Sequence, residues 1–297
     1  MVEGDGKALF PFCHSYLYDG DEFIAFDPQC GKGRLKLAMK NLEKSISDID
    51  FIYNSHFHLD HTAMNAFLKR KSNAEIMIHE ADRIALDDLD VYVKRYGMTD
   101  NKLEPEWREL LKNLGFKAGI VDRTFKDGEI LPGGFQVIHT PGHAPGHCCF
   151  YKSEILISGD IDLTTPWVGN LSSSVADYLN TIDKLKKFEI KLVLPGHRQI
   201  VSEKIPERLE SFRQRFINRE TKILNALPSE PITLDDFTKQ LFQSYSESQR
   251  KQPEHTQAQF ALHFGIISTL NYLKHLETLG KVQNIVQNGQ EYWVRLP

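Results

Sequence analysis

The hexapeptide HFHLDH, which spans residues 56–61, contains three histidines and one aspartate. Neutral imidazole and carboxylate are the ligands that a borderline divalent ion such as zinc prefers. The hexapeptide follows an apolar run, residues 49–53, that is typical of a buried strand. Alternate side chains of an extended stretch point to the same face, so His56 and His58 can share one ion. Asp60 and His61 lie further around the turn, where they can serve a second ion, and the pattern therefore predicts a site for two metal ions.

Three further candidate ligands each follow an apolar run and a short turn that contains glycine. Glycine permits the backbone angles that direct a side chain away from the end of a strand. Polar groups that converge from several strand ends are a common way for an open sheet to build an active site. The first ligand is His143, which ends the segment TPGH after the apolar run 135–138. The second is Asp160, which ends SGD after the run 155–157, and the third is His197, which ends PGH after the run 191–194.

The segments HFHLDH, TPGH, SGD and PGH stand in the order of the motifs of the metallo-β-lactamase superfamily, and the chain resembles that family over roughly residues 8–202. The tripeptide Phe26-Asp27-Pro28 also resembles an early strand-end signature of the family. The resemblance implies an α/β fold, a four-layer αββα sandwich over residues 1–205. A run rich in helix-forming residues predicts a helical insertion in it at about 80–117. The apolar runs before the segments supply the strand context that a motif match requires.

The resemblance also implies the chemistry. Two divalent ions, most readily zinc, with iron or manganese as alternatives, would hold a bridging hydroxide as the nucleophile. Ions about 3.5–4 Å apart can do this and polarise the oxygen of the scissile group. Asp160 would bridge both ions, and Asp60 would also orient the nucleophile. The other ligands would divide between the first ion, with His56, His58 and His143, and the second ion, with Asp60, His61 and His197.

The residue types at two positions indicate which branches of the family the chain resembles. The carboxylate of Asp160 resembles the glyoxalase-II-like, lactonase and nuclease branches, whereas the branches that hydrolyse β-lactams differ at this position. His58 differs from the flavodiiron branch, which has an acidic residue there. The sequence therefore favours a hydrolase, and it disfavours both the hydrolysis of β-lactams and the reduction of oxygen or nitric oxide.

Several other polar residues have structural interpretations. His14, His79 and His139 lie beside apolar runs, where a buried polar group is usually satisfied by hydrogen bonds. His147 lies close to the TPGH segment, and we expect it to support a ligand rather than to bind an ion. Asp162 is expected to cap the turn that follows it.

Length and composition are those expected of a cytoplasmic globular enzyme. The chain has 297 residues, a hydrophobic content of 41% and a charged content of 26%, which are ordinary values for about two domains. A formal net charge of −4 gives no overall attraction to nucleic acid or to an anionic membrane. The four cysteines have the spacing of neither a disulfide framework nor a zinc finger. No apolar run in the sequence is long enough to span a membrane.

The predicted insertion is rich in helix-forming residues and carries the aromatic residues Tyr92, Tyr96 and Trp107. It could form a lid over the metal ions and shape the substrate pocket. The alternative, slightly favoured for any one residue, is that these side chains only pack the helices onto the sheet. Trp167 follows Asp160 closely and is a second candidate for the pocket wall.

The last third of the chain has the pattern of a separate module. Residues 206–227 are predicted to form one amphipathic connecting helix, and Pro228 and Pro231 then interrupt the pattern. Beyond them, helices at 234–242 and 259–279 and a hairpin around Asn288-Gly289 predict a small α+β winged-helix domain over 228–297. This order resembles the carboxy-terminal module of some β-lactamase-like hydrolases, including endoribonucleases.

The charge of this tail argues against a role in binding nucleic acid. From Pro228 to the end it has six Lys and Arg residues against seven Asp and Glu residues. A module that binds phosphates normally has a basic stripe. The apolar second helix instead suits packing against the catalytic domain, or against a second subunit in a homodimer.

Three functions compete. The first, which we favour, is a dinuclear hydrolase that cleaves an acyl bond of a small ester, thioester or lactone. The second is a metal-dependent endoribonuclease, which should present Lys and Arg around the metal ions; residues 69–71 are the only compact basic run near the hexapeptide. The third is a non-enzymatic binding or regulatory module, which the seven ligands disfavour because a structural metal site is normally closed by four.

Overall fold

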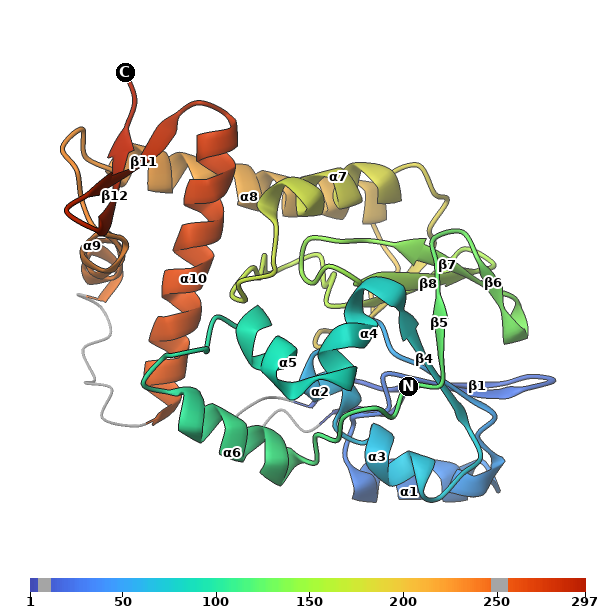
Figure 1. The fold of residues 1–297 in the computed structure, drawn as a ribbon. Helices are drawn as coiled ribbons and strands as arrows, with labels where there is room; N and C mark the ends of the chain where they lie inside the picture. The colour runs from blue at the N-terminus through green and yellow to red at the C-terminus, as the bar shows by residue number, and fades with distance from the viewer. Residues whose placement is uncertain (5–11, 247–255) are drawn as a thin grey trace.

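The first five strands form one mixed sheet. The computed structural model describes residues 1–4, 12–246 and 256–297, and Figure 1 shows it as a ribbon. β1 is antiparallel to β2, whereas β2, β3, β4 and β5 run parallel. The strand order is β1-β2-β3-β4-β5, and the strands are β1 (Tyr16–Asp19), β2 (Phe23–Phe26), β3 (Phe51–Tyr53), β4 (Glu75–His79) and β5 (Arg123–Phe125).

The next five strands form a second sheet, which faces the first. β9 and β10 pair in parallel, and the other pairs are antiparallel. The apolar runs that precede the candidate ligands thus all form strands. The order is β10-β9-β8-β7-β6, and the strands are β6 (Ile130–Leu131), β7 (Phe135–His139), β8 (Cys148–Lys152), β9 (Ile155–Gly159) and β10 (Leu192–Pro195).

Apolar side chains fill three interfaces between layers. Because successive side chains of a strand point to opposite faces, Phe26 of β2 meets Phe150 of β8 between the sheets, whereas Ala25 packs under the helices on the outer face. The outer face of the second sheet is covered in the same way. This is the predicted αββα sandwich, whose covering helices are α1 (Lys32–Asn41) and α3 (Asn65–Lys69) on the first sheet and α7 (Val175–Leu185) and α8 (Ile205–Ala226) on the second.

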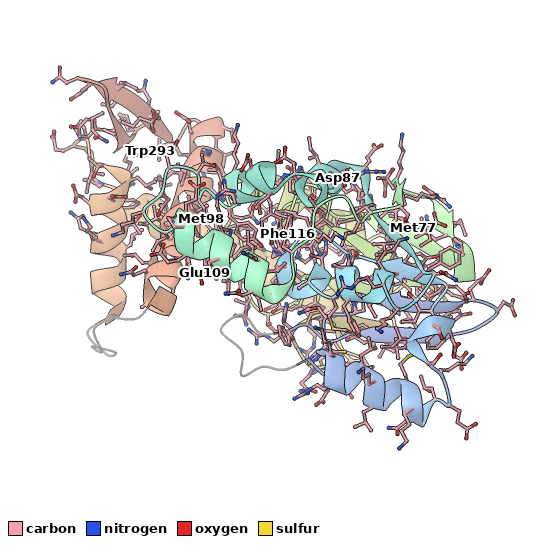
Figure 2. All side chains as sticks on the ribbon, turned by 60° about the horizontal axis from the view of Figure 1, so that its bottom comes forward. Met77, Asp87, Met98, Glu109, Phe116 and Trp293 are labelled. Atoms are coloured by element: carbon pink, nitrogen blue, oxygen red, sulfur yellow. The ribbon has the colours of Figure 1, made fainter. Side chains whose placement is uncertain are left out.

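A helical segment joins β4 to β5 where the sequence predicted an insertion. Its aromatic side chains form a buried cluster that reaches Phe57, inside the hexapeptide. Figure 2 shows Met98 and Glu109 of this segment beside the helices of the carboxy-terminal part. The helices are α4 (Glu80–Asp87), α5 (Leu89–Arg95) and α6 (Glu104–Leu114), while α2 (Leu59–Thr62) and two 3-10 turns (Ile46–Asp48 and Pro132–Gly134) lie outside the segment.

The tail consists of two helices and a hairpin that pack onto the sandwich. Ile232 forms an antiparallel bridge with Trp293 in the hairpin. Trp293 and Phe237 belong to the same apolar cluster as Tyr178 of α7 and Phe212 of α8, so the core continues across the predicted boundary at Pro228. The elements are α9 (Leu234–Ser246), α10 (Thr256–Thr278), β11 (Val282–Gln287) and β12 (Gln290–Arg295).

Helix α10 runs from the insertion at one end to α8 at the other (Figure 1). Near its start, Phe260 lies against Trp107 with ring centroids 5.4 Å apart. Near its end, Leu273 and Leu276 are buried in the cluster under α7 and α8. The long helix therefore packs against the catalytic sandwich of its own chain. Among the described residues, no helix combines the length and the apolar character needed to cross a bilayer.

We expect Leu273→Ala to lower the free energy of unfolding of the whole chain by about 2–5 kcal/mol, because it removes a fully buried side chain from the shared cluster. Chemical denaturation followed by tryptophan fluorescence and by circular dichroism measures this. Leu262→Ala is the matched control, since Leu262 lies on the same helix and is 43% exposed. A separate early transition of the tail, with the sandwich unchanged, would contradict the shared core.

Candidate metal centre

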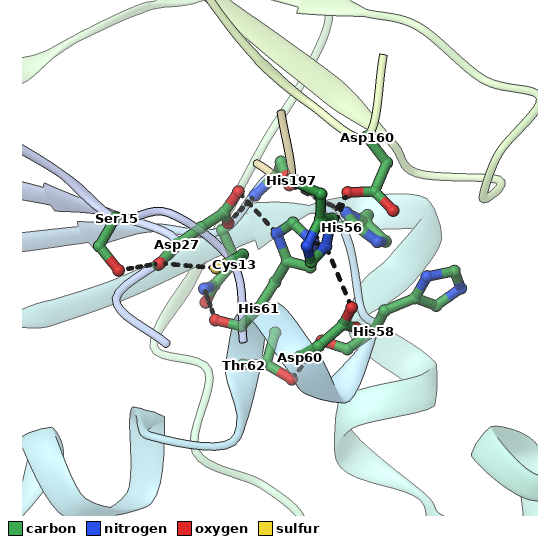
Figure 3. A network of polar contacts seen from close by, with 12 residues as sticks. Cys13, Ser15, Asp27, His56, His58, Asp60, His61, Thr62, Asp160 and His197 are labelled. Atoms are coloured by element: carbon green, nitrogen blue, oxygen red, sulfur yellow. Dashed lines mark hydrogen bonds and ion pairs between the residues drawn. The ribbon is translucent and has the colours of Figure 1, made fainter. Parts of the chain in front are cut away.

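The seven predicted ligands come from the ends of strands in both sheets and meet at one edge of the sandwich. His56 follows β3, and Asp60 and His61 lie on α2. The other ligands follow strands of the second sheet: His143 lies in the β7–β8 turn, Asp160 directly follows β9, and His197 follows β10. Figure 3 shows six of them as sticks: His56, His58, Asp60, His61, Asp160 and His197. Their possible ligand atoms fall into two groups, and within each group the atoms lie within 4.8 Å of one another.

The first group contains three imidazoles and one carboxylate. The Nε2 atom of His143 lies 3.2 Å from Nε2 of His56, 2.9 Å from Nδ1 of His58 and 3.1 Å from Oδ2 of Asp160. All three histidines are buried. The group is therefore compact enough for all four atoms to contact one ion.

The second group lies beside the first and shares a carboxylate with it. The Nε2 atom of His61 lies 3.2 Å from Nε2 of His197, which in turn lies 3.2 Å from Oδ2 of Asp60. The Oδ1 atom of Asp160 lies 2.9 Å from Nε2 of His61. Asp160 thus directs one oxygen toward each group, which is the geometry that a bridging ligand needs.

The chemistry of these groups fits divalent cations. Burial holds the pKa of His56 and of His58 well below its usual range, so both rings are neutral and offer lone pairs. Oδ1 of Asp160 is buried, and ring nitrogens of His61 and His197 lie 2.9 Å and 3.4 Å from it. Ring nitrogens that face one another at about 3 Å repel unless a proton or a cation lies between them. The donor set therefore suits cations better than it suits a network of hydrogen bonds.

Buried polar contacts orient the ligands on the first sheet. Oδ2 of Asp27, at the end of β2, lies 2.9 Å from Nδ1 of His61, and Oδ1 accepts a hydrogen bond from the backbone N–H of Ser55. The Ser55 hydroxyl lies 2.9 Å from Nδ1 of His56. A carboxylate behind a histidine fixes which ring nitrogen faces an ion. Asp27, which the sequence showed as part of a strand-end signature, therefore supports the ligands.

His147 supports Asp160 instead of joining either group. Its Nε2 atom accepts a hydrogen bond from the backbone N–H of Asp160 at 3.2 Å, and its Nδ1 atom lies 2.8 Å from the hydroxyl of Thr140. The residue before Asp160, Gly159, has φ +50, and a Cβ atom there would lie 2.7 Å from His147 Nε2. Glycine is therefore required at this position by both the backbone angle and the close approach.

The loop after Asp160 holds the other side of the first group. His143 Nδ1 lies 3.3 Å from the carbonyl oxygen of Trp167, which leaves Nε2 to face the other ligands. The Asn170 side chain donates to the carbonyl of His143 and lies 3.0 Å from Nε2 of His58. Asn271 of α10 donates to the carbonyls of Val168 and Asn170. The tail therefore reaches the ligands through this loop.

Asp82 of α4 joins the two ligand-bearing loops from the insertion. Its fully buried carboxylate accepts hydrogen bonds from the backbone N–H of Phe57 at 3.1 Å and of Gly146 at 2.8 Å. Arg95 of α5 donates to the same carboxylate at 2.7 Å. Phe57 lies between two ligands, and Gly146 lies three residues after His143. The sequence analysis missed Asp82, Asn170 and Asn271.

A cavity of about 500 Å³ opens onto both groups. Tyr96 and Trp167 line it, as the sequence suggested for aromatic residues of these segments, whereas Tyr92 is buried in the insertion. His14, expected to be structural, also lies in the wall, and its Nδ1 accepts a hydrogen bond from Gly4. Asp162 caps its turn as expected, accepting hydrogen bonds from the backbone N–H groups of residues 164 and 165. Phe264 of α10, which the sequence analysis did not identify, completes the aromatic wall.

The sequence matches a family model and several characterised or named proteins. The model described as the metallo-beta-lactamase superfamily matches residues 9–197. A probable metallo-hydrolase of Methanocaldococcus jannaschii is 28% identical over 63% of this chain and 88% of that protein. The hydroxyacylglutathione hydrolase GloC of Haemophilus influenzae is 26% identical over 62% of this chain and 84% of that protein. An N-acyl homoserine lactonase of a Bacillus species is 31% identical over 55% of this chain and 62% of that protein.

Two solved structures match the fold along nearly the whole chain. A metallo-beta-lactamase family protein of Thermus thermophilus has a TM-score of 0.75 at 21% identity and covers 99% of this chain and 97% of that one. A beta-lactamase domain protein of Burkholderia ambifaria has a TM-score of 0.69 at 17% identity, with coverage of 99% and 90%. Both matches extend over the tail as well as the sandwich.

We expect Asn170→Ala to weaken the binding of one metal ion by about 10–100-fold, the usual cost of losing a group that orients ligands. Competition with a chromophoric chelator measures this affinity for each ion. Asn41→Ala, at an exposed position at the end of α1, is the control. Unchanged affinity for both ions in Asn170→Ala would show that the amide does not hold His58 and His143 in place.

Proposed function

Because the chain belongs to the metallo-beta-lactamase superfamily, we propose that it is a dinuclear metal-dependent hydrolase that cleaves an acyl bond of a small ester, thioester or lactone. The observation that carries the proposal is the carboxylate of Asp160, which directs Oδ2 to the first group and Oδ1 to the second. A single carboxylate between two compact sets of buried ligands is suited to a pair of ions and not to one structural ion.

The proposed ligands are those predicted from the sequence. Zinc fits the mixture of imidazole and carboxylate best, and iron or manganese also bind such donors. Divalent ions bound here would supply an activated water at neutral pH and polarise the oxygen of the scissile group. Asp160 would bridge the ions, and the ligands are His56, His58 and His143 for the first ion and Asp60, His61 and His197 for the second.

The protein's own groups would position the reaction. Asp60 lines the cavity with a partly exposed carboxylate, which can accept a hydrogen bond from the attacking water and so orient it. Tyr96, Trp167 and Phe264 line the same cavity and would bind the apolar part of the substrate and exclude water. Two relatives are named for acyl compounds, hydroxyacylglutathione and N-acyl homoserine lactone, which supports an acyl bond as the target.

An endoribonuclease is the second candidate, because of the tail. The order of α8, the bridge at Ile232, α9, α10 and the β11–β12 hairpin favours our interpretation of the tail as a winged helix. In such modules one helix usually enters the nucleic acid. Here α10 buries Phe260, Leu273 and Leu276 against its own chain, so we propose a structural role for the tail. A non-enzymatic binding or regulatory role is the least favoured of the three functions. That the protein forms a homodimer and that it is cytoplasmic both stay predictions.

We expect Asp160→Asn to reduce kcat by at least about 10³-fold, because it removes the charge of the proposed bridge while keeping the shape of the side chain. Steady-state kinetics on the best substrate measures this, with circular dichroism as a check of the fold. Asp177→Asn, on the exposed surface of α7, is the control. Full activity of a metal-replete Asp160→Asn protein would rule out the bridge.

The substrate class is tested by the metal-replete protein on a parallel panel of acyl thioesters, esters and lactones and on a single-stranded RNA, with the metal content measured on the same sample. We expect acyl turnover that is lost on chelation, and no cleavage of RNA. Cleavage of RNA without acyl turnover would replace the first candidate by the second.

A further inference from the structure

A second cavity, of about 510 Å³, lies next to the metal cavity, between the turn at 164–166, α8 and α10. Its wall is mainly polar and contains three basic side chains. None of the described residues that line it is acidic. Its main polar residues are Thr164, Thr165, Arg215, Asn218, Arg219 and Lys222.

The three basic residues of this cavity lie on one face of α8. Arg215, Arg219 and Lys222 are spaced by four and three residues, which places them in a row along a helix. Arg215 and Lys222 are exposed. Arg213, on the same helix, is instead paired with Asp183 at 3.2 Å. Arg215 and Lys222 therefore offer positive charge to the cavity, whereas Arg213 is used in an ion pair.

The row is joined to the metal cavity by one turn. Thr165 lines both cavities. Arg198, which follows the proposed ligand His197 and lines the metal cavity, donates a hydrogen bond to the hydroxyl of Thr165 at 3.3 Å. Asp162 holds this turn through its two backbone hydrogen bonds and lies 3.3 Å from Nε of Arg198. The turn at Thr165 thus connects the metal cavity with the basic row on α8.

Part of the wall of the metal cavity is instead aromatic. Trp167 and Phe264 face one another with ring centroids 6.0 Å apart, and Tyr96 lies 6.2 Å from Phe264. Among the described residues that line this cavity, Arg198 is the one Lys or Arg. A substrate that spans both cavities would therefore have an apolar part at the aromatic wall and an anionic part at α8.

We propose that the substrate is an acyl thioester or ester of a small carrier that bears phosphate groups, with the apolar acyl group at Trp167 and Phe264 and the phosphates at the α8 row. The inference rests on the proposed function, because it uses the same hydrolysis. Water adds its oxygen to the acyl carbon, the bond from that carbon to the carrier sulfur or oxygen breaks, and the carrier leaves with a proton as a thiol or alcohol. No oxidant or reductant is needed.

A phosphate group fits this wall better than one carboxylate does. Exposed cations in a row, such as Arg215 and Lys222, suit a group with several negative charges, and guanidinium groups bind phosphate oxygens through paired N–H donors. The Asn218 side chain accepts a hydrogen bond from Gln214 through its oxygen, so its amide N–H groups remain as donors. RNA is the less suitable ligand, because a nucleic-acid strand is held through charged contacts along its phosphates, and Arg198 is the one Lys or Arg among the described residues that line the metal cavity.

The test compares the double variant Arg215→Gln and Lys222→Gln with the control Arg213→Gln, which removes a paired arginine from the same helix. Each full-length, metal-loaded protein is assayed with a coenzyme A thioester and with the N-acetylcysteamine thioester of the same acyl chain, which lacks phosphate. We expect the double variant to raise KM for the coenzyme A thioester about tenfold, with kcat nearly unchanged, since two exposed charge contacts are lost. KM for the uncharged thioester should not change, and the control should match the original protein with both substrates.

Calorimetric titration with adenosine 3′,5′-bisphosphate gives a readout that does not depend on activity. We expect binding that weakens with salt and that is lost in the double variant, with the same metal content in all proteins. Equal KM values and equal binding in the double variant would overturn the inference but leave the proposed function intact, provided that both thioesters are hydrolysed. Hydrolysis of neither thioester would overturn the inference, and the proposed function itself would fall only if the esters and lactones of the panel were not hydrolysed either. RNA cleavage that falls in the double variant would assign the row to RNA and overturn the inference.

Discussion

The structure depends on bringing seven electron-donating side chains to one edge of two sheets. Imidazole nitrogens and carboxylate oxygens at about 3 Å from one another repel unless a proton or a cation lies between them, and burial of most of them increases the cost. Asp160 is central to this arrangement because its two oxygens face both groups. The strand ends, the left-handed Gly159 and the hydrogen bond from Asp160 to His147 together fix that carboxylate.

The two sheets and their covering helices do not make all of the contacts that hold the ligand-bearing loops in place. The insertion contributes Asp82, which accepts hydrogen bonds from the backbone beside the ligands of both sheets. Its charge is matched by Arg95 at 2.7 Å, and breaking such a buried pair is usually costly because the remaining charge has no partner. The tail contributes Asn271, which holds the loop at 167–170, and Phe264, which lines the cavity. Insertion and tail thus both hold loops that carry the ligands, and they contact each other through Trp107 and Phe260.

The sequence predicted the ligands and the layers well, because both depend on local patterns. His56 and His58 are two residues apart, and each other ligand follows its own apolar strand, so the pattern is visible without any knowledge of packing. Asp82, Asn170 and Asn271 could not be found in this way, since the partners that tie them to the site, such as Arg95, His58 and the Asn170 carbonyl, lie 13 to 112 residues away. One signal was present: Asn271 is a polar residue in the apolar stripe of α10, and a buried amide needs hydrogen-bond partners. The basic run at 69–71 was a weak guide, because Lys69 pairs with Asp122, and the positive charge beside the metal cavity comes from α8.

The most direct test of the account is the anomalous diffraction of crystals of the metal-loaded protein, recorded on either side of the absorption edge of the bound metal. The account predicts two separate peaks, one among His56, His58 and His143 and one among Asp60, His61 and His197, with the carboxylate of Asp160 between them. A single peak in a fully loaded protein, or a second peak away from Asp160, would contradict the shared carboxylate on which the proposed chemistry depends.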